Sequence, residues 1–314
     1  MTESKGYICY IINPNSGASS NKRLVSGLKD YLDEKKADVR TNFTNSLTHA
    51  SKLAAQAAVD YDCRMVIAAG GDGTIREVAQ GLEGSDKPLL VVPSGTENLL
   101  ANELGFNLKV DSLIAAYEGN CVKPLDLGCF NDKCFTSIAG FGFDGDVVRR
   151  LSNIRTGHIC HMDYFWPIWR TFWEYIFPPM KVTVDGEVLF EGRGLIFVGN
   201  ITRYAIGLEI LKNGNISDGL LDICIFKCEN QAHLLKHAAW TVVKAHLRGS
   251  DSIYKQGKDV LVESLEGTIY SEIDGDPGPA LPAKITIIPQ ALRVLVPPGA
   301  KPAGIRTRLA RMIG

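Results

Sequence analysis

The stretch AAGGDGTIREV, residues 68–78, predicts the fold of the first half of the chain. It joins an apolar run, 64–69, to a segment whose apolar residues recur at helical spacing, with glycines at the junction. Glycine between a strand and a helix typically lets a phosphate lie against backbone N–H groups. Yet Asp72 stands among these glycines, and two like charges about 4 Å apart repel by about 4 kcal/mol at a protein surface. We therefore expect Asp72 to hold a cation, to order the loop or to handle a proton.

The same strand–loop–helix pattern recurs on both sides of this stretch. Residues 7–12 and 89–92 are apolar and read as strands, and each is followed by a loop and a helical pattern. Alternating strands and helices predict a parallel sheet with helices on both faces. Ligands of such sheets bind beyond the carboxyl ends of the strands, where the loops at Asn13, Gly70 and Pro93 would lie.

The pattern changes after residue 125. Short strand-like runs separated by turn signals predict an antiparallel β-sandwich, interrupted by helical segments at roughly 144–177 and 230–247. We expect an α/β fold with a Rossmann-like domain over 1–125, a β-sandwich domain over 126–296 and an active site in the cleft between them. Residues 297–314 would form a terminal helix that packs back on the first domain, a membrane-surface role being the less favoured alternative.

Composition and charge narrow the classes of function. The 314 residues carry a formal net charge of −1, which offers no general attraction to nucleic acid or anionic lipid. No apolar run approaches the roughly 20 residues that span a bilayer, and the start of the chain does not resemble a secretory signal. The eight cysteines form no Cys-x-x-Cys pair, which indicates reduced thiols in a cytoplasmic protein.

Three predicted loops share the features of phosphate-binding loops, because each offers glycine N–H groups and a hydroxyl. They are Asn13–Gly17, Gly70–Thr74 and Pro93–Asn98. None has the Walker or the Rossmann glycine pattern, and any one of them alone is compatible with an ordinary turn. Three such loops at one edge of one sheet favour a nucleotide site.

These three motifs, in this order and spacing, resemble the catalytic domain of the diacylglycerol kinase and bacterial lipid kinase family, to which sphingosine kinases and NAD kinases are related. The resemblance covers residues 7 to 296, and Pro93–Asn98 followed by Leu-Leu-Ala favours the lipid branch. It implies that ATP binds across the loops. The implied nucleotide-binding positions are Asn13, Pro14, Asn15, Ser16, Gly17, Thr44, Gly70, Gly71, Asp72, Gly73, Thr74, Ile75, Arg76 and Thr96. Arg76 departs from the family, which usually has Asn there; a guanidinium can face phosphate but cannot accept a hydrogen bond.

The segment Ser271–Pro277 supplies carboxylates. Strand alternation would place Glu272, Asp274 and Asp276 on one face, whereas Gly275 and Pro277 favour a turn with solvated acids. The resemblance is to a Leu-Asp-Gly-Glu motif whose acids serve as catalytic base and as Mg²⁺ or phosphate ligand. Asp276 replaces the Glu, which leaves a slower, rearranged or degenerate enzyme as alternatives. We expect Asp274 or Asp276 to act as the base, with Asp72 as a rival.

Three further segments bear on function. The literal Asp-Gly-Glu at residues 185–187 lies between two apolar runs and predicts a two-residue hairpin turn. Residues 215–222 resemble a cation-binding segment of the family, which implies Asn215, Asp218 and Leu220 as metal ligands. The aromatic run 164–177 predicts a helix packed on the sandwich, with an acyl-chain pocket or a membrane-resting face as the alternative; Arg149, Arg150 and Arg155 precede it.

Together these features predict an ATP- and Mg²⁺-dependent lipid kinase that phosphorylates a hydroxyl of diacylglycerol or a similar lipid. It would be cytoplasmic, touch the inner face of the membrane transiently, bind no nucleic acid and be able to form a homodimer. Three alternatives stay open: a kinase of a soluble substrate such as NAD, a catalytically weakened pseudokinase, and a non-enzymatic lipid-binding module.

Overall fold

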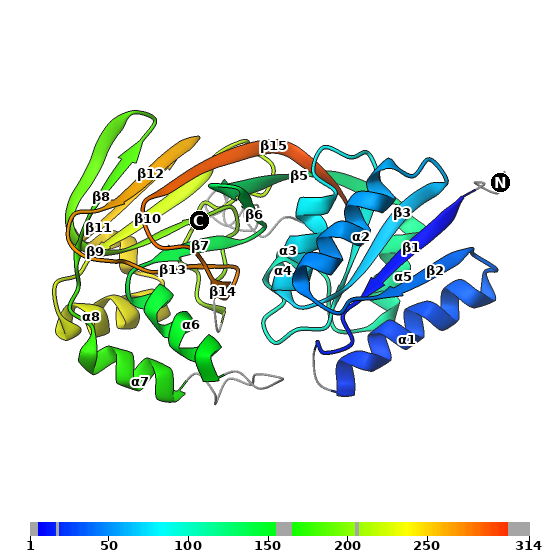
Figure 1. Cartoon of the computed structure of the whole chain (residues 1–314), viewed down its shortest axis with the longest axis horizontal. Helices are drawn as coiled ribbons and strands as arrows, with labels where there is room; N and C mark the ends of the chain where they lie inside the picture. The colour runs from blue at the N-terminus through cyan, green and yellow to red at the C-terminus, as the bar shows by residue number, and fades with distance from the viewer. Residues whose placement is uncertain (1–5, 17–18, 155–164, 205–206, 301–314) are drawn as a thin grey trace, which may run out of the picture. The chain divides into compact units, whose positions relative to one another are not determined.

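The computed structural model describes the chain except for residues 1–5, 17–18, 155–164, 205–206 and 301–314 (Figure 1). The chain divides into two compact units, Met1–Leu127 with Pro289–Gly314, and Gly128–Ile288. It passes from one unit to the other within strand β5 (Cys121–Phe130) and returns within strand β15 (Ala283–Val296). The terminal helix expected beyond residue 300 lies outside the described residues.

The first unit is the predicted parallel α/β domain. Its sheet has the order β2-β1-β3-β4-β15, and every neighbouring pair in it is parallel. The remaining elements up to β5 are β1 (Tyr7–Ile12), α1 (Ser19–Glu34), β2 (Val39–Phe43), α2 (Leu47–Val59), β3 (Cys63–Gly70), α3 (Asp72–Gly81), β4 (Pro88–Pro93), α4 (Leu99–Glu103) and α5 (Val110–Gly119).

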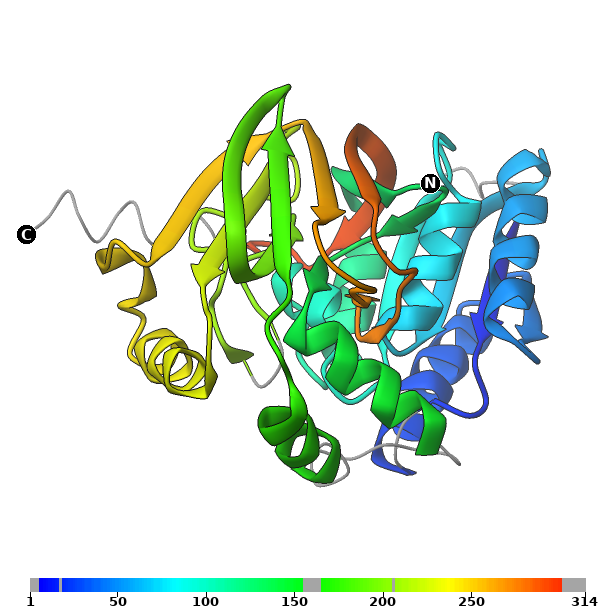
Figure 2. The same cartoon turned by 60° about the vertical axis from the view of Figure 1, so that its left-hand side comes forward.

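Helices cover both faces of this sheet, as the alternating pattern predicts. Helix α1 contacts α5 and helix α2 contacts α3, and the two pairs lie on opposite faces (Figures 1 and 2). All six residues of β1 are buried, which explains its continuous apolar sequence. The chain runs from β1 to β2 on one side and then back past β1 to β3 on the other side. The order in which strands are added to the sheet therefore reverses between β1 and β3. Ligands of doubly wound sheets bind at such a reversal.

The second unit is an antiparallel β-sandwich with helices. Its elements are β6 (Lys133–Phe135), β7 (Ile138–Phe141), α6 (Phe143–Ile154), α7 (Phe165–Glu174), β8 (Pro179–Val184), β9 (Glu187–Gly199), β10 (Leu221–Lys227), α8 (Gln231–Val242), the 3₁₀ helix η3 (His246–Arg248), β11 (Ser252–Gly257), β12 (Asp259–Ser264), β13 (Ser271–Ile273) and β14 (Asp276–Pro277).

Strand β9 joins the two layers of the sandwich, because its first half pairs with β8 and its second half pairs with β10 and β7. The core between the layers is built from alternate strand residues such as Val182, Ile223 and Ile285. A second core cluster, which includes Tyr175 and Phe177, lies where helices cover the sandwich. In Figures 1 and 2, α6, α7 and α8 lie together below the strands of this unit.

Two predictions about this unit can be compared with the structure. The Asp185-Gly186 hairpin turn is confirmed: both residues have positive φ, Val184 pairs with Glu187, and the Asp185 carboxylate accepts hydrogen bonds from two backbone N–H groups. The expected packing of the aromatic run against the sandwich is wrong for most of α7, because Trp166, Trp169 and Trp173 are exposed. No described helix is long and apolar enough to span a membrane.

Candidate active site

The loops that follow β1, β3 and β4 meet at the carboxyl edge of the sheet in the first unit. The hydroxyl of Ser16 donates to the backbone carbonyl of Ser94 at 3.2 Å, and Ser94 N donates to the carbonyl of Gly70 at 3.0 Å. The amide of Asn13 donates to the hydroxyl of Thr74 at 2.9 Å. The three candidate loops are therefore tied to one another, as the parallel strands predict. Gly17 lies outside the described residues.

Two glycines set how closely these loops approach. A Cβ atom placed on Gly95 would lie 2.5 Å from the Cα of Gly71, and one placed on Gly71 would lie 3.3 Å from the Cα of Gly95. A side chain at Gly95 would force the two backbones apart, and one at Gly71 would need a shift of a few tenths of an ångström. The result is a stretch of bare backbone on which a phosphate can lie, at the start of a helix whose N-terminal dipole favours anions.

Asp72 and Arg76 both belong to helix α3. Asp72 lies in its first turn and is half-buried. Arg76 lies one turn later, is buried, and places its guanidinium 3.3 Å from a carboxylate oxygen of Glu77. The predicted phosphate contact of Arg76 stays a prediction. Thr44, whose N–H donates to the carbonyl of Ile12 at 2.9 Å, follows β2 at the same edge of the sheet. Thr96 is exposed in the third loop.

Asn98 belongs to the third predicted loop, but the sequence did not predict that its side chain shapes the loop. Asn98 has a φ of 51° and forms two hydrogen bonds with Gly95: its amide oxygen accepts from the N–H at 2.7 Å, and its amide nitrogen donates to the carbonyl at 3.0 Å. These bonds hold Gly95 against Gly71. Asparagine adopts positive φ more readily than most residues. An asparagine at the end of the motif is therefore the sequence feature that could have indicated this turn.

The acidic segment in the second unit is a hairpin, and its acids do not share one strand face as alternation predicted. Strands β13 and β14 are antiparallel, and Asp274-Gly275 forms the two-residue turn between them with φ values of 50° and 80°. Because positive φ at both turn positions matches the twist of the strands, the segment closes after Ile273 instead of continuing. Glu272 therefore lies within β13, Asp274 in the turn and Asp276 in β14.

The Asp274 side chain is enclosed by hydrogen-bond donors. Its two oxygens accept from the backbone N–H groups of Thr136, Ser137 and Ile138 at 2.9 to 3.0 Å, and from the Thr136 hydroxyl at 3.2 Å. Only 4% of the residue is exposed. These bonds fasten the tip of the hairpin to the start of β7. Asp276, by contrast, is only half-buried.

A second pair of carboxyl groups lies beneath the hairpin, and sequence reasoning did not find it. Asp144 of α6 and Glu272 of β13 approach the same side of Gly140; Glu272 is fully buried and Asp144 is partly buried. Burial, and then the neighbouring Asp144, raise the pKa of Glu272 well above its ordinary value, while burial raises the pKa of Asp144 to about 6. One proton shared between them resolves the repulsion. The Tyr204 hydroxyl donates to Asp144, and Gly275 N–H donates to Glu272 at 2.8 Å.

The predicted cation-binding segment lies in the turn before β10. Asn215 accepts hydrogen bonds from Ser217, and Asp218 accepts one from the N–H of Leu220 at 3.1 Å, so both side chains also order the turn. Among the described residues no cluster of three His, Cys, Asp or Glu side chains could hold a metal ion. The nearby Asp222 is buried, its Oδ2 has no hydrogen-bond partner, and burial raises its pKa to about 6. Metal binding by Asn215, Asp218 and Leu220 stays a prediction.

Comparisons with known proteins cover both units. Residues 7–130 match the model of the diacylglycerol kinase catalytic domain, and residues 137–296 match that of the YegS C-terminal NAD kinase β-sandwich-like domain. A diacylglycerol kinase of Mycobacterium tuberculosis is 30% identical over 299 residues, covering 93% of this chain and 96% of the relative. A diacylglycerol kinase of Bacillus subtilis is 28% identical over 293 residues, covering 91% and 95%.

The fold also matches solved structures. A crystal structure of a diacylglycerol kinase from Bacillus anthracis superposes with a TM-score of 0.67 at 21% sequence identity, covering 94% of this chain and 98% of that one. This likeness establishes the fold, and the two family models establish which residues correspond to which domain.

Proposed function

Since the chain belongs to the bacterial diacylglycerol kinase family of lipid kinases, we propose that it transfers the terminal phosphoryl group of ATP to a hydroxyl of diacylglycerol or a similar lipid. The observation that carries this proposal is the contact of Gly71 with Gly95, because it presents bare backbone at the edge of the sheet where phosphates bind. The family relationship supports a kinase, and the loop geometry supports the triphosphate as its donor.

The residues around this contact fit a nucleotide. Helix α3 begins at Asp72 after an N-cap glycine, Gly71, which has no side chain to cap the helix, so the N-terminal end of the helix dipole would face the ligand. Asn13, Ser16 and Thr74 add an amide and two hydroxyls that can bond to phosphate oxygens or hold the loops in place. Binding would therefore depend on main-chain N–H groups more than on any one side chain.

Asp72 is suited to bind the cation that accompanies a triphosphate. Mg²⁺ typically binds one or two carboxylates together with substrate phosphates and keeps several waters, and a single Asp beside the phosphate loop fits that donor set. When bound, the ion would neutralise charge that develops on the phosphates during transfer. Asp72 would hold the ion directly or through water. The bound ion would also offset the repulsion between the Asp72 carboxylate and the phosphates of the nucleotide.

Asp274 and Asp276 of the hairpin would have different roles toward the lipid acceptor. The burial of Asp274 and the four hydrogen bonds that its carboxylate accepts support an anchoring role, in which it positions the turn. Asp276, half-buried in β14, is the better candidate to accept the proton of the lipid hydroxyl. Asp72 is the rival base. The second cation, at Asn215, Asp218 and Leu220, would stabilise the turn before β10 and take no part in transfer.

The acceptor lipid resides in a membrane, so the enzyme must reach a bilayer surface at least transiently. We place it on the cytoplasmic side, where both ATP and the inner leaflet are available. The charge of −1 for the whole chain gives no general attraction, and a local patch must supply the contact.

A transfer assay tests the proposal. The protein is incubated with labelled ATP, Mg²⁺ and vesicles of total membrane lipid, with NAD offered in a parallel reaction, and the labelled product is identified by mass spectrometry. We expect one dominant phospholipid product, lost in Asp276→Asn and in Asp72→Asn. A labelled product from NAD alone would assign the chain to a soluble substrate. Nucleotide binding by calorimetry without any labelled product would identify a pseudokinase, and ATP-independent vesicle binding alone a lipid-binding module.

A further inference from the structure

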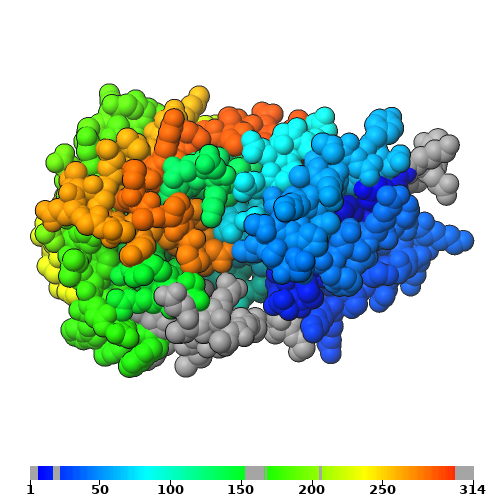
Figure 3. Space-filling view, viewed as in Figure 1, coloured from blue at the N-terminus to red at the C-terminus, as the bar shows by residue number. Residues whose placement is uncertain are grey.

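Helix α7 exposes an unusually aromatic face. The exposed fractions are 64% for Trp166, 49% for Trp169, 61% for Trp173 and 77% for Ile176, the second residue after the helix. Trp169 and Trp173 pack edge to face against each other at 5.7 Å between ring centroids, so they form one surface. Figure 3 shows α7, in green, at the surface of its unit at the lower left. A contiguous exposed apolar patch of this kind typically marks an interaction site.

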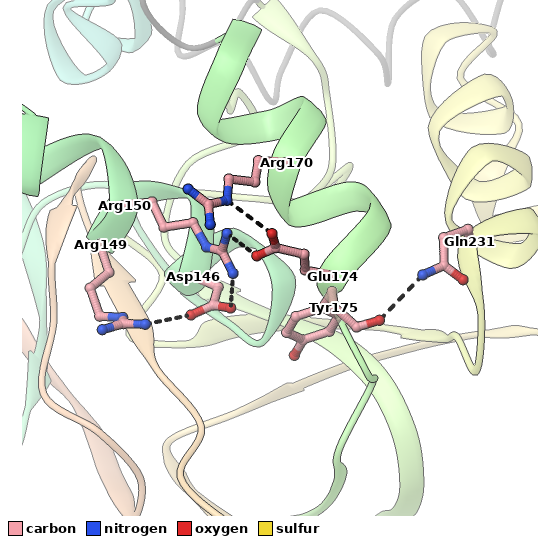
Figure 4. Close-up of polar contacts among 7 residues, drawn as sticks. All are labelled: Asp146, Arg149, Arg150, Arg170, Glu174, Tyr175 and Gln231. Atoms are coloured by element: carbon pink, nitrogen blue, oxygen red, sulfur yellow. Dashed lines mark hydrogen bonds and ion pairs between the residues drawn. The ribbon is translucent and has the colours of Figure 1, made fainter.

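The opposite side of α7 is firmly held, so the exposed face does not result from a helix that fails to pack. Thr171 is fully buried, and Tyr175, directly after the helix, belongs to the second core cluster. The carbonyl of Tyr175 accepts a hydrogen bond from the side chain of Gln231 in α8 at 3.3 Å (Figure 4). The helix therefore offers its tryptophans to the outside in a fixed orientation.

Arginines accompany this face. Glu174 bonds to Arg150 of α6 at 2.5 Å and to Arg170 at 2.9 Å, and Asp146 lies 3.4 Å from Arg149 (Figure 4). The group thus holds three guanidinium groups against two carboxylates. The most exposed side chains of the group are Arg170 at 62%, Glu174 at 46% and Arg149 at 41%, so the group presents a small excess of positive charge. Tryptophan rings beside arginine are typical of protein segments at a membrane–water boundary.

We propose that the α7 face, defined by Trp166, Trp169, Trp173 and Ile176 with Arg149, Arg150 and Arg170, docks on an anionic bilayer surface. The indole rings would enter the headgroup region, and the guanidinium groups would bond to lipid phosphates. The inference rests on the proposed function in one respect: a lipid acceptor gives the chain a reason to reach a bilayer. A second copy of the chain fits less well, because a two-fold contact through this face would bring arginines together.

Intrinsic fluorescence tests the proposal without altering the face. Three of the four tryptophans of the chain lie in α7, and the fourth is Trp240. In a Trp240→Phe protein the emission therefore reports on α7 alone. We expect a blue shift with vesicles of mixed phosphatidylglycerol and phosphatidylcholine, and quenching by lipids brominated near the headgroup. The response should weaken with phosphatidylcholine alone and at high salt, because exposed charges are screened. An unchanged spectrum with anionic vesicles overturns the proposal.

Substitution of the face provides the second test. The triple variant Trp166→Ser, Trp169→Ser and Trp173→Ser should sediment with anionic vesicles at least roughly tenfold less than the unaltered protein, because three apolar side chains no longer leave water. Val59→Ser with Tyr61→Ser is the matched control, since both residues are almost fully exposed in the first unit. Unfolding curves check that all variants fold. Equal sedimentation of the triple variant and the unaltered protein overturns the proposal. The proposal is also overturned if the unaltered protein is a dimer and the triple substitution disrupts that dimer without changing vesicle binding.

A short-chain diacylglycerol dispersed without vesicles separates this inference from the proposed function. If both hold, the triple variant phosphorylates the dispersed acceptor normally and loses activity only on vesicles. Absence of lipid phosphorylation by the unaltered protein would contradict the proposed function while leaving the vesicle-binding result to stand by itself. Normal activity of the triple variant on vesicles would contradict the docking face alone.

Discussion

Gly71 and Gly95 lie back to back at the carboxyl edge of the parallel sheet, and a Cβ atom on Gly95 would stand 2.5 Å from the Cα of Gly71. This separation is shorter than any normal carbon–carbon contact, so an alanine must push the second and third loops apart. The closeness of the two loops thus depends chiefly on the absence of a side chain at Gly95.

The first prediction concerns this contact. Gly95→Ala is expected to cost about 1–3 kcal/mol of unfolding free energy, as overpacking typically does, and to weaken ATP binding strongly. Gly249→Ala is the matched control, because Gly249 has a φ of −94° and its Cβ would meet no atom closer than 3.9 Å. Denaturant unfolding and calorimetry measure the two effects. Normal ATP binding by Gly95→Ala would show that the backbone contact does not form the site.

The two hairpin acids should respond differently to the same change. In Asp274→Asn the amide cannot accept all the hydrogen bonds from residues 136–138, so we expect a loss of about 2 kcal/mol in stability together with lost activity. The backbone should not contribute, because asparagine tolerates the φ of 50° at this turn.

Asp276→Asn provides the comparison within the same hairpin. It should abolish transfer while the melting temperature stays close to that of the unaltered protein, since Asp276 is half-buried at the edge of the hairpin. Melting curves and initial rates distinguish the two. An Asp276→Asn protein with full activity would rule out this carboxylate as the base and return that role to Asp274 or Asp72.

The Asp144–Glu272 pair predicts a dependence of stability on pH. Its pKa values are raised in the folded state, so between the unfolded and folded values the native protein binds more protons than the unfolded chain. The contribution of this pair to the unfolding free energy is therefore highest at acid pH and falls as pH rises from about 4 upward, by about 1.4 kcal/mol for each unit of raised pKa. Asp144 loses its share by about pH 6, and Glu272 loses its share further above.

Glu272→Gln tests the origin of this dependence, because glutamine copies the protonated acid at every pH. We expect the variant to be more stable than the unaltered protein at about pH 8 and nearly equal at about pH 5. Part of the slope should persist, since burial also raises the pKa of Asp222 to about 6. Urea unfolding at several pH values measures the difference. A variant that is less stable at alkaline pH would mean that the pair does not share a proton.

Asn13 links the first loop to the second through Thr74, and its side chain also accepts the N–H of Asn15 at 3.0 Å. Without these bonds the first loop loses its position, and Asn13→Ala should raise the KM for ATP roughly three- to tenfold with little change in kcat. Asn107→Ala, at an exposed position of the same unit, should leave both constants unchanged. Equal KM values for the two variants would exclude a role for the Asn13 side chain in nucleotide binding.

The sequence predicts the sheet and its loops well because both follow from local patterns. Short apolar runs such as 7–12 indicate buried strands, and parallel strands bring the loops at Asn13, Gly70 and Pro93 to one edge. The Asp185-Gly186 turn is equally local. The contact of Gly71 with Gly95 does not follow from a local pattern, because no rule of sequence spacing states how closely two loops approach each other.

The positions of the acidic residues in the second unit depend even more on contacts that the sequence pattern does not predict. Alternation predicts one face for Glu272, Asp274 and Asp276, but the two-residue turn at Asp274 outweighs it. Asp144 and Glu272 are 128 positions apart and meet only because α6 contacts β13. For α7, helical spacing identifies an aromatic stripe but cannot tell what covers it, and the tryptophans lie outside.

A crystal structure with a non-hydrolysable ATP analogue and Mg²⁺ would show directly where the nucleotide binds. We expect density for the phosphates on the backbone of Gly71 and Gly95, with the ion within reach of the Asp72 carboxylate. Nucleotide bound at another place, with this edge of the sheet occupied only by water, would contradict this expectation.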